Sequence, residues 1–165
     1  QWLQQRRGRF MSSIYHGWLV EALATTGDMV GARRQAAALF ARARQLDTFG
    51  MGDGCRALAL ATAATGDQGR TARLMAYAER YASLRGSGRE AALNALCCAR
   101  LAVLRGDDAD ALAHGEAAAD AFDAMHIAWH ARSARALIDG VPSQLQGTAA
   151  NAAAMAASAT AASAS

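Results

Sequence analysis

The sequence repeats a Gly-Asp dipeptide at nearly constant spacing. Three copies, Gly27-Asp28, Gly66-Asp67 and Gly106-Asp107, are 39 and 40 residues apart, and each of the three lies between two apolar stretches of helical length. Glycine adopts the left-handed conformation that ends one helix, and aspartate caps the free amides at the start of the next. The period therefore predicts three helical hairpins, each closed by one Gly-Asp turn.

Helix boundaries follow from these turns and from local start and stop signals. Ser87 followed by Glu90 forms a capping box at the expected start of the third hairpin. Gly140 and Pro142 stand where a seventh helix should stop. A helical-repeat domain is therefore expected over residues 13–139. Its predicted first helices are 13–26, 53–65 and 88–105, its second helices are 29–46, 68–84 and 108–125, and its terminal helix is 127–139.

Composition favours an all-α fold. Alanine supplies over a quarter of the 165 residues, proline occurs once and aromatic residues make up 6%. Alanine is the best helix former, and strands favour aromatic and β-branched residues. We expect a right-handed superhelix of antiparallel helix hairpins, an α-α superhelix with about seven helices. Its expected core holds Leu19, Leu23, Leu39, Phe40, Leu46, Leu58, Leu74, Met75, Tyr77, Tyr81 and Leu84, and its expected close helix contacts are made by Ala32, Ala36, Ala59, Ala99 and Ala111.

The two ends of the chain differ from the repeat region. Residues 1–12 do not begin with Met and contain Trp2 and Leu3, so we expect a remnant of an upstream segment. Residues 140–165 form an Ala/Ser-rich low-complexity tail. A helix without a large apolar face has nothing to bury, so we expect this tail to be disordered or frayed.

Several positions are similar to the tetratricopeptide repeat (TPR) family. Leu19 and Leu58 fall on the family's leucine, and Ala32 and Ala111 fall on the alanine five residues after the turn glycine. The closing proline is absent, and the period exceeds the family's usual length of about 34 residues. The chain thus resembles degenerate TPR-like repeats. The resemblance implies a superhelix whose inner, concave face is built from first helices and carries specificity.

The longer period is similar to the C-terminal helical repeats of large bacterial transcription and signalling regulators, in which a sensor ATPase precedes such repeats. The segment from Trp18 to Leu23 before Gly27, and the one from Phe122 to Trp129, have this character. The resemblance implies a regulatory or scaffolding module without an activity of its own.

The resemblance also implies where a partner would bind. Mapped on the first helices, the inner face includes a set of candidate groove residues: Glu21, Arg56, Leu60, Asn94 and Arg100. Arg56 and Arg100, with Asn94 nearby, are expected to hold a peptide backbone or a carboxylate through forked hydrogen bonds. The alternative is that these are ordinary solvated side chains.

No set of residues predicts catalysis or a bound metal. His126 and His130 are spaced to share one helix face, but no third ligand and no intervening Glu accompany them. Cys97 and Cys98 are not followed by a Cys-His-Asp arrangement. Gly50-Met51-Gly52 follows no predicted strand and is expected to be an inter-repeat turn rather than a phosphate loop. We expect no enzyme activity, no catalytic residue, no metal and no cofactor.

Charge bears on the class of partner, and cysteine content and hydropathy bear on the cellular location. All cationic side chains are arginine and the net charge is +3, too small an excess to predict direct nucleic-acid contact. Residues 1–105 hold fifteen arginines and seven acids, whereas residues 106–165 hold two and seven. Three cysteines without paired spacing suit a reducing compartment, and there is no apolar run of membrane-spanning length. A cytoplasmic location is expected.

Two functions remain open from the sequence. The first is a non-catalytic helical-repeat module that binds a protein or peptide partner, or another domain of the same bacterial regulator. The alternative is an effector-sensing module that takes a peptide or small ligand in the concave groove. Exposed repeat ends would also allow self-association.

Overall fold

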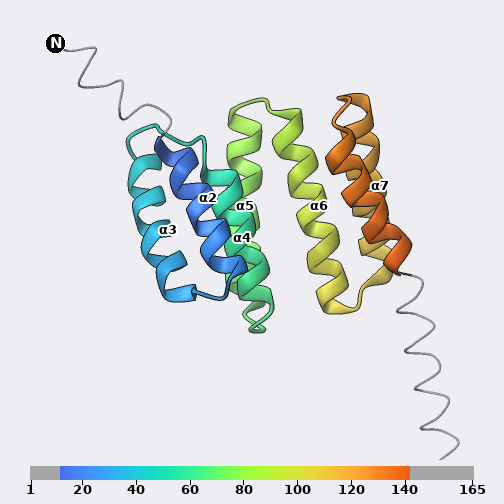
Figure 1. The fold of residues 1–165 in the computed structure, drawn as a ribbon, viewed down its shortest axis with the longest axis horizontal. Coiled ribbons are helices and arrows are strands. Elements are labelled where there is room, and N and C mark those ends of the chain that lie inside the picture. The colour runs from blue at the N-terminus through green and yellow to red at the C-terminus, as the bar shows by residue number, and fades with distance from the viewer. Residues whose placement is uncertain (1–11, 142–165) are drawn as a thin grey trace, which may run out of the picture. The chain divides into compact units, whose positions relative to one another are not determined.

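The computed structural model describes residues 12–141, and within them the chain forms seven α-helices and no strand (Figure 1). The helices are α2 (Ser12–Thr25), α3 (Met29–Ala43), α4 (Met51–Ala63), α5 (Gln68–Leu84), α6 (Gly88–Arg105), α7 (Asp108–Ala124) and a last helix, 128–141. The predicted all-α fold of consecutive helical hairpins is confirmed. Of the two predicted end segments, only Ser12 and residues 140 and 141 lie within the described residues, and all three are helical.

The chain divides into two compact units between Cys97 and Cys98, inside α6. In the first unit, α2 packs against α3 and α4, and α4 packs against α5. In the second unit, Ala102, Ala111 and Val141 form a buried cluster. In this unit α7 and the last helix also lie close together. A Cβ added at Gly115 of α7 would be 2.8 Å from the Ile138 side chain.

The Gly-Asp turns have the predicted geometry. Gly27, Gly66 and Gly106 have φ values of +86°, +83° and +71°, in the region that glycine tolerates best. The aspartate after each glycine accepts a hydrogen bond from a backbone amide in the first turn of the next helix. These bonds join Asp28 to Gly31 at 2.8 Å, Asp67 to Arg70 at 2.9 Å, and Asp107 to Asp110 at 3.1 Å.

The turn before α5 yields a direct prediction. Gly66→Ala should lower the free energy of unfolding by about 1 kcal/mol because alanine is strained at positive φ, and Asp67→Ala should cost about as much through the lost cap. Gly66→Asn is the matched control, since asparagine tolerates this conformation better. Urea unfolding followed by circular dichroism measures all three, and unchanged midpoints for both alanine variants would contradict the turn's role.

Several helix boundaries differ from those predicted by one to three residues, and three of these differences change the position of a named residue. Helix α3 ends at Ala43 rather than at 46, and Leu46 lies beyond it with φ 67°. Helix α4 starts at Met51 rather than at 53, so Gly52 is helical and is not a turn residue. The last helix runs through Gly140, which therefore does not stop it. Pro142 lies outside the described residues.

Part of the predicted core is confirmed. Leu39, Leu58, Leu74 and Met75 are buried, as are all five alanines expected at close helix contacts. Leu19, Leu46, Tyr77 and Leu84 were expected in the core, and this is wrong: they are 43%, 89%, 43% and 68% exposed. Leu46 falls outside because α3 ends early, whereas Tyr77 and Leu84 lie on a face of α5 that points to solvent.

Hydrogen bonds hold the loop between α3 and α4 against the start of α2. Asp47 accepts hydrogen bonds from the Ser13 amide at 3.0 Å and from the Ser13 hydroxyl at 2.5 Å. The same hydroxyl oxygen accepts a bond from the Gly50 amide at 3.1 Å. At the far end of the loop, the Arg85 guanidinium lies 4.7 Å from the centre of the Phe49 ring. These contacts fix where α4 begins.

Candidate partner-binding surfaces

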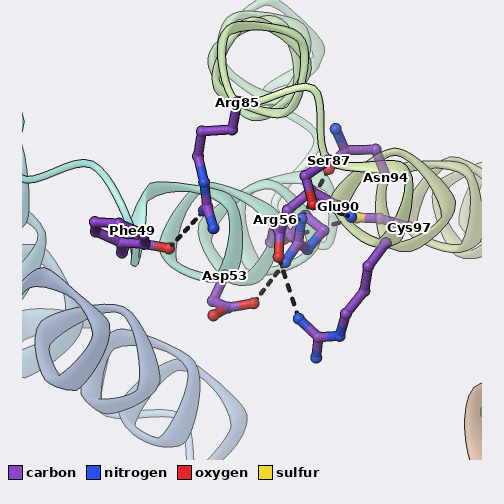
Figure 2. Close-up of polar contacts among 9 residues, drawn as sticks. Phe49, Asp53, Arg56, Arg85, Ser87, Glu90, Asn94 and Cys97 are labelled. Atoms are coloured by element: carbon purple, nitrogen blue, oxygen red, sulfur yellow. Dashed lines mark hydrogen bonds and ion pairs between the residues drawn. The ribbon is translucent and has the colours of Figure 1, made fainter. Parts of the chain in front are cut away.

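Arg56 of α4 lies at the centre of a buried polar cluster (Figure 2). Its Nη1 donates to Glu90 Oε2 and to Asn94 Oδ1, both at 2.9 Å. Its Nη2 donates to Asp53 Oδ1 at 2.5 Å. The guanidinium therefore joins α4 to the first half of α6 by one ion pair and one further hydrogen bond, and it forms a second ion pair with Asp53 within α4.

Local sequence makes room for this cluster. A Cβ at Gly52 would lie 2.2 Å from Glu90 Oε2 and 2.9 Å from Arg56 Nη1, so glycine leaves the space that the ion pair fills. The predicted capping box is half formed: Ser87 Oγ accepts from the Glu90 amide at 3.3 Å. The Glu90 carboxylate instead binds Arg56 and, at 3.2 Å, Arg89.

The expectation that Arg56 and Asn94 present exposed polar groups to a partner is wrong. Arg56 is 7% exposed and Asn94 is 5% exposed. Within residues 12–141, no buried side-chain nitrogen or oxygen lacks a hydrogen-bond partner. The mapping failed because it treated each first helix as an isolated surface, whereas Glu90 supplies a buried counter-charge from the next first helix.

The other predicted groove residues are placed separately. Glu21 and Arg100 are exposed and Leu60 is half-buried. The structure brings Asn94 to Arg56, but Arg100 belongs to the second unit.

Of the three cysteines, Cys55 and Cys97 are buried and Cys98 is half-buried. Burial raises the pKa of Cys55 to about 12, and the nearby positive charge of Arg56 lowers it only in part. Since the thiolate is the reactive form, Cys55 is protonated and unreactive near neutral pH.

We expect Cys55 to resist iodoacetamide at pH 8 in the folded protein and to react in ~6 M guanidinium chloride. The raised pKa also predicts that stability falls as pH rises above about 9, where the unfolded thiol loses its proton and the folded one, with a pKa of about 12, keeps it. Peptide mapping of the alkylated protein measures the first effect. Full labelling of Cys55 without denaturant would contradict it.

The two histidines considered for a metal have other environments. His126 lies in the turn after α7 with φ 58°, and the His130 ring packs against Phe122 with centroids 4.9 Å apart. Among residues 12–141, no group of three or more His, Cys, Asp or Glu side chains is arranged to hold a metal ion. In the same range, no helix has the length and apolarity needed to span a membrane.

One exposed apolar cluster lies on α2. Tyr15 and Trp18 are 71% and 56% exposed, and their rings meet edge to face with centroids 5.9 Å apart. Leu19 extends the cluster on the same face of the helix.

A second exposed surface lies on α3 and α5 and consists of two rows of side chains. Successive members of each row are separated by three, four, three and four positions, a spacing that keeps them on one helix face. The α3 row is Val30, Arg33, Ala37, Phe40 and Arg44, and the α5 row is Arg70, Arg73, Tyr77, Arg80 and Leu84. All are exposed except Phe40, which is half-buried. We call the two rows together the α3–α5 surface.

The two rows adjoin one another. The Phe40 and Tyr77 rings meet edge to face with centroids 5.7 Å apart, so the rows meet at this point. Helix α3 contains no acidic residue, and the one acid of α5, Glu79, falls on another face of its helix. Within the described part of the chain, none of the five row arginines has an ion pair. The surface is thus basic and interleaved with apolar side chains.

Comparison with protein-family models, with curated proteins and with solved structures finds no match to this chain.

Proposed function

We propose that the chain is a non-catalytic helical-repeat module that binds another protein, or another domain of a larger bacterial regulator. The observation that carries this proposal is the α3–α5 surface. Arginine and aromatic side chains are enriched where proteins bind one another. A surface that served only solubility would gain nothing from exposing Val30 at 69% and Leu84 at 68%.

The repeat pattern supports the same proposal. Stacked helical hairpins resembling TPR-like repeats build extended surfaces from many small, similar units. The buried Arg56 cluster stiffens one of these units, because a satisfied polar network fixes the positions of the helices it joins. A rigid scaffold loses little conformational entropy on binding.

Affinity capture with the tagged, full 165-residue chain tests this function. The test variant is Arg73→Glu/Arg80→Glu, and the control is Arg100→Glu/Arg132→Glu, which makes the same change in net charge at two other exposed sites. We expect the wild type and the control to retain the same protein from a lysate of the source cells, and the test variant to lose it. Equal recovery by all three chains would contradict binding through the α3–α5 surface.

A further inference from the structure

We infer that the α3–α5 surface takes an acidic amphipathic α-helix as its partner. This inference rests on the proposed function and names the chemical class of the partner. Two properties of the surface carry it: the apolar side chains that it exposes and the sign of its charge.

The length of the α5 row suits a helical ligand. The α5 row runs over 15 residues from Arg70 to Leu84, and its 14 steps of about 1.5 Å give a length of about 21 Å. Its alternating steps of three and four are those by which one helix meets another along a shared seam. A helix laid along this row presents anchors at the same intervals, as in other helix-in-groove complexes.

The apolar members of the rows distinguish a protein helix from a nucleic acid. Val30 and Leu84 are each more than two-thirds exposed, and Tyr77 is 43% exposed next to Phe40. A phosphate backbone has no apolar side chains with which to cover valine and leucine. The apolar face of an amphipathic helix covers them and gains hydrophobic free energy from the burial.

The positive charge of the surface indicates that its partner carries negative charge. Arg33 and Arg44 belong to the α3 row, and Arg70, Arg73 and Arg80 belong to the α5 row. Among the described residues, these guanidinium groups have no acid paired with them. Carboxylates beside the apolar seam of the ligand would supply the missing counter-charges, whereas lysines there would be repelled.

The test uses synthetic peptides and the full chain. The probe is a fluorescein-labelled peptide of about 21 residues, or three heptads, with leucine at a and d and glutamate at e and g. One control peptide has the same composition without the heptad pattern, and the other carries lysine for glutamate. A single-stranded oligonucleotide and a duplex of similar length complete the set. Fluorescence anisotropy measures each Kd at about 50 mM and about 500 mM NaCl.

We expect the acidic heptad peptide to bind at least about tenfold more tightly than either control peptide or either nucleic acid. Arg73→Glu/Arg80→Glu should weaken its binding about tenfold or more, and Tyr77→Ser should weaken it at both salt concentrations. Arg100→Glu/Arg132→Glu should change its Kd less than twofold. Circular dichroism of each variant confirms that the helices are retained.

Three results would overturn the inference. Equal binding of the scrambled peptide would show attraction to charge alone, and tighter binding of an oligonucleotide would identify a nucleic-acid surface. Unchanged binding by Arg73→Glu/Arg80→Glu would place the ligand elsewhere. Any of these results leaves the proposed function standing if the capture experiment still recovers a protein through the same two arginines.

Discussion

Arg56→Met is expected to lower the free energy of unfolding by about 3–5 kcal/mol, the range for breaking one side of a buried ion pair. Methionine fills much of the volume but leaves two carboxylates, Asp53 and Glu90, without the guanidinium that now lies between them. The Glu90 side chain is 8% exposed, so water cannot replace the lost partner. Guanidinium chloride unfolding monitored by circular dichroism measures the loss.

Arg100→Met is the matched control because Arg100 is exposed and has no ion pair within the described residues. It should change stability by no more than about 0.5 kcal/mol. Replacing both partners, as Arg56→Met/Glu90→Leu, should recover part of the loss, since no carboxylate at position 90 is then left unpaired. If Arg56→Met lowers the free energy of unfolding no more than Arg100→Met does, the ion pairs of Arg56 do not stabilise the fold, and this prediction is wrong.

Gly50→Ala is expected to destabilise the protein by about 3 kcal/mol, at the upper end for overpacking a rigid site. The added Cβ would lie 1.9 Å from the Ser13 carbonyl oxygen and 2.5 Å from the Ser13 carbonyl carbon. Both atoms are backbone, so relief requires that α2 and the loop move apart. That movement would also break the hydrogen bonds that Ser13 makes with Asp47 and Gly50.

Gly69→Ala is the control for glycine replacement itself. Gly69 lies in the first turn of α5, and its nearest neighbour to a new Cβ is Asp67 Oδ1 at 3.9 Å. Alanine should therefore be tolerated there or add about 0.5 kcal/mol through helix propensity. Thermal melts of the two variants separate the effects: similar shifts in Tm for both would show that contact with Ser13 does not set the cost at Gly50.

Most of the fold follows from local signals in the sequence. Gly66 ends one helix and Asp67 starts the next through interactions within a few residues. Such a turn can therefore be predicted from the sequence alone. The end of α3 was placed three residues too late because Leu46 continues the apolar period. Nothing local to Leu46 reveals that Asp47, one residue later, is held by Ser13.

The predicted exposure of Arg56 and Asn94 is wrong for a related reason. Arg56 and Glu90 are 34 positions apart, and sequence alone does not show that two first helices bury this pair between them. A local signal was nonetheless present, since Asp53 precedes Arg56 by one helical turn and forms an ion pair with it. Tyr77 and Leu84 were assigned to the core by helical spacing, and only their exposure shows that this spacing belongs to a surface row.

Hydroxyl-radical footprinting of the full chain, alone and with its captured partner, tests most directly whether recognition occurs on α3 and α5. If the partner binds the α3–α5 surface, we expect it to protect Val30, Tyr77 and Leu84 from oxidation. Trp129, which is exposed on the last helix, should react equally in both samples. Protection of Trp129 or of Leu60, the half-buried residue of α4, with Val30, Tyr77 and Leu84 unchanged would contradict it.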